Sequence, residues 1–194
     1  MVRNSRVVLA QRPEPGEFPQ PRHFRMESQE IQNSIEGSSV LVQVVYASVD
    51  PAMRGWMTQA KSYITPVRLG DVMRAQGVGR IVACGVDVPG DRFKIGDLVE
   101  GMFGWQTLCS VSFDKVRNIS GLIKATGVSP TAFLGVLGGT GMTAYFGLFH
   151  VGNPQPGDTI LVSGAAGAVG SIVGQLARIK GCKVCTFCWI SLVF

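Results

Sequence analysis

The chain has 194 residues, of which 46% are hydrophobic and 16% charged, and its formal net charge is +5. This composition predicts a globular protein with a sizeable core, and because the Lys and Arg residues are scattered singly, it argues against a nucleic-acid-binding patch. The longest apolar stretch, Val184–Phe194, is shorter than the ~20 residues of a membrane span, and the first residues form no secretory signal. We therefore expect no membrane association and a cytoplasmic location.

The first part of the chain has the pattern of a β domain. Apolar residues alternate with small or polar ones over Ser39–Val49 and Val78–Val86, as in half-buried strands. A third strand is predicted within 93–101, entered through a Gly-Asp turn pair. The more polar segment 57–74 is expected to form a loop with a short turn. Strands at this spacing predict a barrel-like β domain over roughly the first 120 residues.

The pattern changes to helical after residue 128. Ser129 is expected to cap a short helix with Pro130 at its first position. Three glycines, Gly138, Gly139 and Gly141, are expected to break the chain before a second helix. His150 would lie in the last turn of that second helix, where a cation or imidazole suits the helix dipole. Neither His150 nor His23 belongs to a recognisable catalytic or metal-binding group.

A βαβ unit is predicted over the last part of the chain. A turn at Pro156-Gly157-Asp158 leads into a buried strand over 159–163, and a helix follows a Gly-rich turn. The helix ends with Lys180 and Gly181, and the next strand begins near Cys182. The apolar positions with helical spacing are Val169, Ile172, Val173, Leu176 and Ile179. This order of elements predicts a dinucleotide-binding fold.

The Gly-rich turn matches G-x-G-x-x-G with alanine at the first glycine. It is Ala165-Ala166-Gly167-Ala168-Val169-Gly170. Gly167 would let the backbone approach a pyrophosphate at the helix N-terminus, and Gly170 would let the helix lie close to the strand. The alternative is a βαβ unit whose glycines serve packing only. No Asp or Glu follows Asp158, which argues weakly against a preference for NAD.

Cysteines are the remaining candidates for a metal site. Cys182, Cys185 and Cys188 form C-x2-C-x2-C, which is one pattern of iron–sulfur proteins. Such clusters need a fourth cysteine nearby, and the sequence has only Cys84 and Cys109 besides. Free thiols in a core, around a buried strand, are therefore the favoured interpretation.

Five segments together resemble the zinc-independent, NADP-dependent double-bond reductases of the medium-chain dehydrogenase/reductase superfamily. They are "YASVDPAMRGWM", "SYITPVRLGDVMRAQGVGRIV", "GDLVEGMFGWQ", "LGGTGMTAYFGL" and "VSGAAGAVGSIVGQLARIKGCKV". The resemblance, to alkenal-, prostaglandin- and curcumin-type reductases, runs from about residue 5 to Val184. It implies an α/β protein: a GroES-like, partly open β-barrel domain, here over residues 1–125, followed over 126–194 by the first βαβ part of a Rossmann domain.

The activity implied is reduction of the C=C bond of α,β-unsaturated ketones and aldehydes with NADPH. A quinone reductase of the same superfamily is an alternative. Zinc alcohol dehydrogenases share the fold but carry Cys and Gly-His-Glu ligands where this chain has "YASVDP" and "AQGVGR". With no thiolate or imidazole at these places, we expect no metal.

The resemblance also assigns site residues. The pyrophosphate turn corresponds to Gly167, Ala168, Val169 and Gly170, and the helix start beside the nicotinamide ring corresponds to Met142 and Thr143. Asp50 and Arg54 match a segment at the substrate cleft, although an ion pair that fixes the turn would explain them equally well. The family's catalytic tyrosine has no counterpart in these residues, because it lies beyond the end of the chain.

The sequence departs from the family after Val184, where it continues as "CTFCWISLVF". Relatives have a Gly-Ser-containing loop there, with a basic residue for the 2′-phosphate of NADP. The chain therefore resembles a reductase truncated at its C-terminus, and a non-catalytic product is the second hypothesis for its role. Relatives are often dimers, so a homodimer that acts on a small-molecule enone or enal is the expected assembly.

Overall fold

The computed structural model describes residues 1–32, 35–60 and 64–187, and the chain divides into two compact units, Met1–Pro130 and Thr131–Phe194. The predicted tail after Phe187, with Cys188, lies outside the described residues. The first unit contains β1 (Val2–Leu9), β2 (Phe24–Ile31), β3 (Ser39–Ala47), α1 (Ala52–Trp56), β4 (Gly77–Cys84), β5 (Leu98–Gly101), β6 (Leu108–Ser112), β7 (Val116–Asn118) and α2 (Ser120–Thr126). The second contains α3 (Gly139–Tyr145), β8 (Thr159–Ser163), α4 (Ala168–Ile179) and β9 (Lys183–Phe187).

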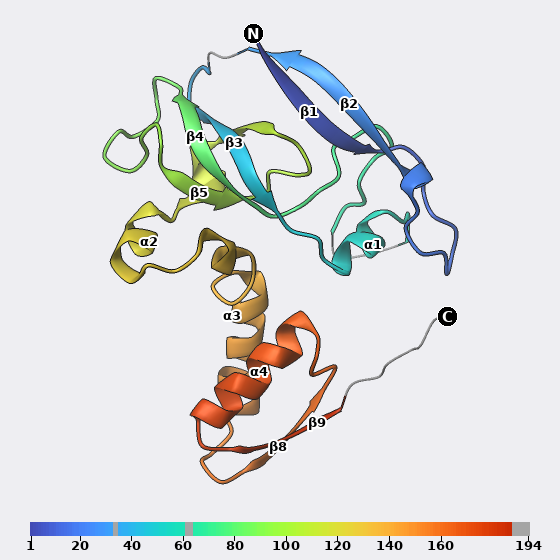
Figure 1. Cartoon of the computed structure of the whole chain (residues 1–194), viewed down its shortest axis with the longest axis vertical. Coiled ribbons are helices and arrows are strands. Elements are labelled where there is room, and N and C mark those ends of the chain that lie inside the picture. Colours follow the sequence, from blue (N-terminus) through green and yellow to red (C-terminus); the bar gives the residue numbers. More distant parts are fainter. Residues whose placement is uncertain (33–34, 61–63, 188–194) are drawn as a thin grey trace. The chain divides into compact units, whose positions relative to one another are not determined.

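Two antiparallel sheets build the first unit (Figure 1). β1 pairs with β2 along their whole lengths, and the larger sheet has the order β6-β3-β4-β5-β7. The pairing of β3 with β4 shifts register between Leu41 and Val42 and again between Val44 and Tyr46. Such irregularities bend a strand and increase its twist. The larger sheet therefore curls into a partly open barrel, which confirms the predicted fold class.

The predicted strands of this unit are confirmed at β3, β4 and β5. The segment 57–74 contains no helix or strand among its described residues, as expected. The structure also contains β1 and β2, where the sequence analysis predicts no strand. In β2 the more buried positions do not alternate with the exposed ones, and Met26 is 78% exposed, so the strand lacks a period-two signal.

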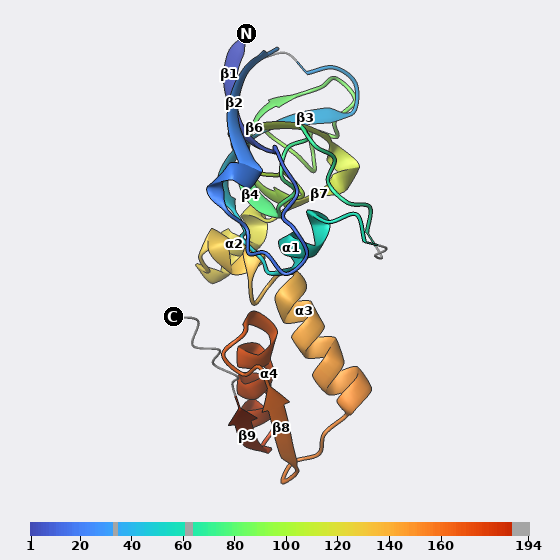
Figure 2. The ribbon, with the colours of Figure 1, turned by 90° about the vertical axis from the view of Figure 1, so that its right-hand side faces the viewer.

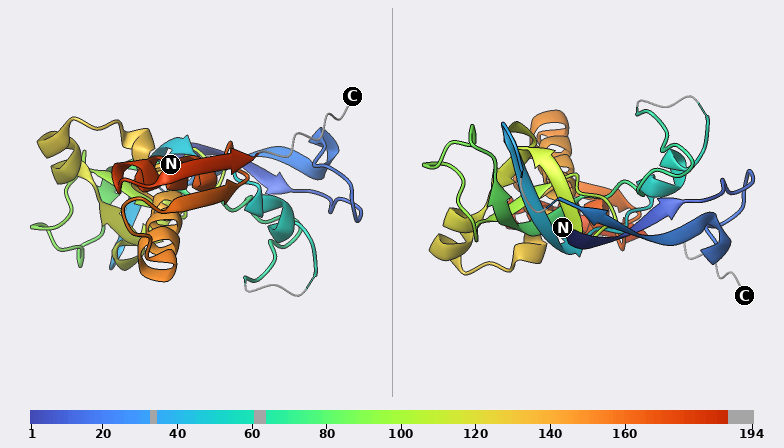
Figure 3. Two further views of the ribbon diagram at one scale, coloured as in Figure 1. Left: turned by 90° about the horizontal axis from the view of Figure 1, so that it is seen from below. Right: turned by 90° about the horizontal axis from the view of Figure 1, so that it is seen from above.

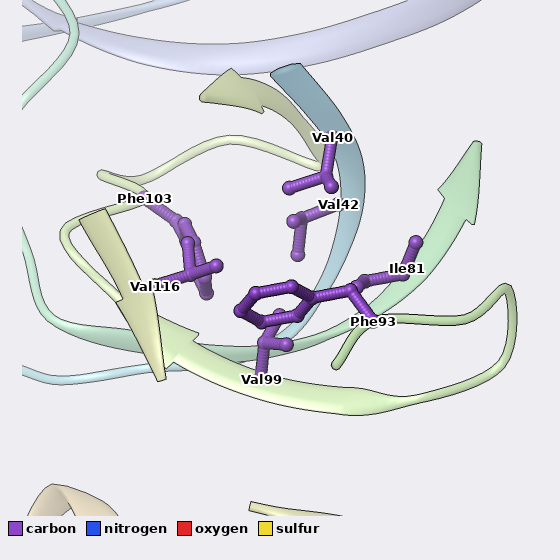
Figure 4. Close-up of a cluster of buried hydrophobic side chains, with 7 residues drawn as sticks. All are labelled: Val40, Val42, Ile81, Phe93, Val99, Phe103 and Val116. Atoms are coloured by element: carbon purple, nitrogen blue, oxygen red, sulfur yellow. The ribbon is translucent and has the colours of Figure 1, made fainter. Parts of the chain in front are cut away.

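Two apolar clusters form the core of the first unit. The first lies inside the curled sheet (Figure 4) and consists of Val40, Val42, Ile81, Phe93, Val99, Phe103 and Val116. The second lies between β1 and α1 and consists of Leu9, Met53, Met57, Val67, Met73 and Ala75. Phe24 and Trp105 pack against the second cluster from its edge. This second cluster is the floor of the pocket described below.

The second unit is the predicted βαβ unit. β8 and β9 are parallel neighbours, from Thr159 beside Lys183 to Ser163 beside Phe187 (Figure 3). α4 connects them and packs against α3 (Figure 2). Its core is formed by Leu148, Ala177 and Cys182, with Ile160, Val173, Leu176 and Val184 packed against them.

The expectation of a buried strand at 159–163 is wrong for the described chain. Val162 is buried, but Leu161, which points to the other face, is 69% exposed. The described sheet has two strands, and α4 covers the face that carries Val162. β8 therefore has more apolar side chains than the described unit buries.

The helical region before β8 differs from the prediction. Pro130 does begin a short 3₁₀ helix, Pro130–Leu134, but Gly139 and Gly141 lie in the first turn of α3 instead of breaking the chain. A Cβ at Gly141 would lie 1.8 Å from the carbonyl oxygen of Val136, so glycine lets the helix start pack against the preceding loop. α3 continues into a π-helical segment, Phe146–Gly152. No helix of the described residues is long and apolar enough to cross a membrane.

We expect Gly79→Ala to destabilise the first unit. A Cβ at this position of β4 would lie 2.4 Å from Val42 Cγ1 and 2.6 Å from the carbonyl oxygen of Gln43. Overpacking of this kind typically costs about 1–3 kcal/mol, measurable by chemical denaturation. Gly90→Ala is the matched control, because a Cβ there would meet no atom within 4 Å. Equal stability of the two variants would contradict the close approach of β3 and β4.

Candidate functional site

The chain turns from β8 into α4 through backbone contacts alone. Gly164 has φ of +59°, in the left-handed region that favours glycine. Its carbonyl oxygen accepts a hydrogen bond of 2.8 Å from the N–H of Gly167. Gly167 is the N-cap residue of α4, and the N–H of Ser171 donates to its carbonyl oxygen at 3.0 Å. The helix therefore begins after a four-residue turn, residues 164–167, whose hydrogen bonds named here join backbone groups.

Gly170 and Gly167 keep this turn open. A Cβ at Gly170 would lie 2.4 Å from the carbonyl oxygen of Gly164, and one at Gly167 would lie 3.0 Å from the same atom. The first turn of α4 contains no acidic residue. Because the N–H groups at a helix N-terminus lack acceptors within the helix and form the positive end of its dipole, the turn can hold an anion.

A pocket of about 430 Å³ lies beside this turn, within the second unit. Gly170, Gly174 and Arg178 line it from α4, and Val184 and Thr186 line it from β9. Among the described residues that line this pocket, Arg178 is the one with a positively charged side chain. The pocket is a surface recess next to the turn, large enough for part of a nucleotide.

Met142 and Thr143 lie on α3, in the same unit as the turn, and both are exposed. The hydroxyl of Thr143 donates a hydrogen bond of 2.8 Å to the carbonyl oxygen of Gly139, one helical turn back. This bond fixes the rotamer and leaves the oxygen free to accept another. Both side chains are thus accessible to a ligand.

The two segments that correspond to zinc-ligand positions lie side by side in the first unit. Ala47 pairs with Gly77, and the N–H of Ser48 donates to the carbonyl oxygen of Gln76 at 2.8 Å. The hydroxyl of Ser48 is buried and has no hydrogen-bond partner among the described residues. The side chains of these two hydrogen-bonded residues are the hydroxyl of Ser48 and the amide of Gln76. Among the described residues there is no group of three or more His, Cys, Asp or Glu that could hold a metal ion.

An apolar pocket of about 650 Å³ lies on the second core cluster, within the first unit. Asp50 and Arg54 are the charged residues of its described lining, which brings the two predicted cleft residues to one place. The indole of Trp105, also in the lining, donates to the carbonyl oxygen of Ser48 at 3.1 Å. The pocket therefore adjoins the strand end that carries Ser48.

Arg54 does not form the ion pair that the sequence left open. No ion pair joins Asp50 and Arg54 in the part of the chain that the structure describes. Arg54 instead donates from Nε to the carbonyl oxygen of Glu17 and from Nη2 to that of Glu14, both at 2.9 Å. Its guanidinium holds the loop between β1 and β2 against α1 (Figure 1).

His23 has more partners than the sequence analysis predicts. Its ring is buried, and Nδ1 accepts a hydrogen bond of 2.8 Å from the N–H of Gln20. Because Nδ1 is an acceptor, Nε2 carries the proton, and it faces Glu17 Oε2 at 3.4 Å. The N–H of Glu14 donates to the Glu17 carboxylate and lowers its pKa, and Arg22 and His23 lower it further. His23 therefore fixes the same loop as Arg54, and its position six residues after its acidic partner Glu17 gave no sequence signal.

The cysteines do not form a described metal site. Cys182 is buried, and its thiol lies 3.4 Å from the carbonyl oxygen of Gln155, so the prediction of a core thiol is correct there. Cys185 lies inside β9 and is exposed, so the same prediction is wrong for it. Its side chain points to the face of the ribbon that α4 does not cover. Burial raises the pKa of the Cys84 and Cys109 thiols.

We expect Gly170→Ala to disturb the turn and Gly174→Ala to be tolerated. A Cβ at Gly174 would lie 3.8 Å from Val184 Cγ1, an ordinary contact, whereas the Cβ at Gly170 would overlap a carbonyl oxygen. The first change should lower the free energy of unfolding of the second unit by about 1–3 kcal/mol. The second should raise it by up to about 1 kcal/mol. Hydrogen exchange of α4 amides measures both, and equal effects would contradict the geometry of the turn.

We also expect a specific loss of stability in acid. Since the pKa of Glu17 is below its ordinary value of 4.5, its stabilising effect is complete above that pH and is lost as the pH falls through the folded-state pKa. Glu17→Gln should therefore flatten the pH dependence of the unfolding free energy below pH 4.5. Glu36→Gln, at an exposed position, is the control. Parallel curves for wild type and Glu17→Gln would contradict the loop contacts described above.

Comparison with solved structures and characterised proteins relates both units to known enzymes. The NADPH-dependent curcumin reductase of Escherichia coli (strain K12) is 41% identical over 182 residues, which is 94% of this chain and 50% of that protein. The NADP(+)-dependent 2-alkenal reductase of Nicotiana tabacum is 37% identical over 153 residues, 77% of this chain and 42% of that protein. The crystal structure of CurA from Vibrio vulnificus in complex with NADPH superposes with a TM-score of 0.84 at 35% identity, covering 96% of this chain and 52% of that one.

This chain thus spans about half the length of the curated relatives it matches. A family profile described as "N-terminal domain of oxidoreductase" matches residues 5–119, more than half of the chain and nearly all of the first unit. The similar proteins named above are NADP-dependent reductases. The chain therefore belongs to the oxidoreductase family defined by this N-terminal domain, within the medium-chain dehydrogenase/reductase superfamily.

Proposed function

We propose that the protein reduces the carbon–carbon double bond of α,β-unsaturated ketones and aldehydes with NADPH. The observation that carries the proposal is the Gly-rich turn between β8 and α4, where Gly164, Gly167 and Gly170 lead the chain closely into a helix N-terminus that has no acidic residue in its first turn. The 41% identity to a curcumin reductase and the 37% identity to a 2-alkenal reductase support the reaction class.

NADPH fits the residues of the second unit. Gly167, Ala168, Val169 and Gly170 would lie against the pyrophosphate, whose charge the free N–H groups at the N-terminus of α4 would stabilise. The exposed side chains of Met142 and Thr143 would lie beside the nicotinamide ring. When bound, NADPH supplies a hydride to the β-carbon of the enone, and the α-carbon takes up a proton.

The reaction proposed is independent of zinc. Zinc sites use Cys sulfur, His nitrogen and carboxylate oxygen, whereas the strand ends here offer the hydroxyl of Ser48 and the amide of Gln76. A substrate carbonyl would be polarised by hydrogen-bond donors. The buried, unpartnered hydroxyl of Ser48 is one such donor in the first unit.

The substrate is proposed to bind at the pocket that contains Asp50 and Arg54. Arg54 would act there by holding the loop that carries Phe18, since its Nε and Nη2 groups donate to backbone carbonyls. We also propose that the chain has two domains, over residues 1–125 and 126–194, and that the second has a Rossmann fold. The proposed assembly is a homodimer, and the proposed location is cytoplasmic.

We expect NADPH oxidation with an enone when the chain is joined to the part of the Escherichia coli curcumin reductase that it does not match. Gly167→Val should reduce the affinity for NADPH at least about tenfold, because a side chain there would displace the phosphate. Gly147→Val, at a position with no atom within 4 Å of a Cβ, should leave it unchanged.

Three outcomes would contradict the proposal in whole or in part. Unchanged affinity of the Gly167→Val variant for NADPH would remove the turn from the cofactor site. Loss of activity on treatment with a zinc chelator, restored by added zinc, would refute zinc independence. Reduction of a quinone without reduction of any enone would favour the quinone reductase alternative.

A further inference from the structure

We propose that a recess between the β1–β2 hairpin and β6 binds a small carboxylate with a short aliphatic chain. The recess has a volume of about 390 Å³ and lies within the first unit. It adjoins the point where the N–H of Thr107 donates to the carbonyl oxygen of Ser5 at 2.9 Å (Figure 2). It shares no described lining residue with the pocket that contains Asp50 and Arg54. The ligand is therefore distinct from the proposed substrate.

Two amide side chains in this recess have a fixed orientation. The N–H of Leu108 donates to the Asn4 side chain at 3.0 Å, so the Asn4 atom that accepts this bond is its oxygen. The amide nitrogen of Asn4 therefore donates, at 3.1 Å, to the side-chain oxygen of Gln106. The amide nitrogen of Gln106 in turn donates to the carbonyl oxygen of Phe103 at 2.7 Å. The oxygens of both amides are thus occupied within the protein.

This network leaves hydrogen-bond donors for a ligand. An amide nitrogen carries two N–H groups, and Asn4 and Gln106 each use one of them among the described residues. Asn4 is only 4% exposed, so its remaining N–H group can meet only a partner that enters the recess. Because a buried donor without an acceptor is costly, the network favours a ligand that supplies acceptor atoms.

Arg6 adds a positive charge to the recess. Its Nε and Nη2 groups donate to Glu27 at 3.0 and 2.8 Å, and its Nη1 group has no acceptor in the part of the chain that the structure describes. Glu27 also accepts two hydrogen bonds from Arg25, so two guanidinium groups share one carboxylate. The described lining contains Arg6 and no Asp or Glu. A carboxylate ligand would therefore neutralise an excess positive charge.

Apolar side chains also line the recess. They are those of Ile31, Ile35 and Leu108. Burial raises the pKa of the Cys109 thiol, which also lines the recess, so this thiol is neutral and does not repel an anion. An inorganic anion would leave the apolar surfaces in contact with water, whereas an aliphatic chain would cover them. The combination of donors, charge and apolar surface therefore fits an organic carboxylate.

The test is a titration of the chain with isovalerate, a branched monocarboxylate, followed by NMR of nitrogen-labelled protein. The side-chain amide signals of Asn4 and Gln106 should shift. The indole N–H signal of Trp105, which reports on the pocket with Asp50 and Arg54, should not shift. Isovaleramide, a neutral amide of the same shape, should bind at least about tenfold more weakly, because it brings no charge to Arg6.

Two variants of one ion pair should change the affinity in opposite directions. Arg6→Gln removes the proposed cation and should weaken isovalerate binding about tenfold or more, whereas Glu27→Gln removes a competing carboxylate and should strengthen it about threefold. If the pair served the fold alone, both variants would change the affinity in the same direction. Arg3→Gln is the matched control, because Arg3 is exposed, donates to Ser28 and does not line the recess. It should leave the affinity unchanged.

Several results would overturn the proposal. They are equal affinity for isovalerate and isovaleramide, a shift of the Trp105 indole signal without shifts of the two amides, and a change in the same direction in Arg6→Gln and Glu27→Gln. A loss in Arg3→Gln as large as in Arg6→Gln, or an absence of binding at millimolar concentration, would also overturn it. None of these measurements involves NADPH or an enone, so the proposed reaction and this proposal can fail separately.

Discussion

The close approach of the start of α4 to the end of β8 is the constraint on which the functional account depends. The carbonyl oxygen of Gly164 occupies the space where a side chain at Gly170 would lie, 2.4 Å from its Cβ. Only glycine allows the helix to begin there and leaves its first N–H groups facing an open turn. The position of α4 relative to β8 also affects its packing on β9, because α4 connects these two parallel strands and contacts both. The proposed cofactor binding and the packing of the second unit thus depend on one backbone geometry.

The first unit contributes a different kind of site. Its curled sheet brings the ends of β3 and β4 together, where a hydroxyl and an amide stand instead of zinc ligands. Beside this strand end, the buried methionines of the second core cluster adjoin an apolar pocket, next to a loop held by Arg54 and His23. Our proposal therefore assigns these residues to hydrogen bonds and apolar contacts rather than to a metal ion.

Local patterns in the sequence are sufficient to predict the βαβ unit and β3, β4 and β5, because helical spacing, period-two alternation and the Gly-rich turn are short-range signals.

Contacts between residues far apart in the sequence could not be predicted from such patterns. β2 has no alternating pattern and exists because it pairs with β1, from Val2 beside Ile31 to Leu9 beside Phe24. The sequence left open an ion pair between Asp50 and Arg54, and could not indicate the actual acceptors of Arg54, which are backbone carbonyls 37 and 40 residues away. His23 was missed although its ring partners, Gln20 and Glu17, are close in sequence, because this spacing matches no recognised motif. Gly141 lies in α3 at a close approach to the Val136 carbonyl that residue preferences do not indicate.

The central claim is that the turn from Gly164 to Gly170 holds the pyrophosphate of NADPH. Hydrogen–deuterium exchange with and without NADPH tests it most directly, because the backbone N–H groups of the turn are the proposed ligands. The account predicts protection of the amides at the start of α4, with no change in the first unit's β1 and β2. Protection confined to other segments, or none at a saturating concentration of NADPH, would contradict it.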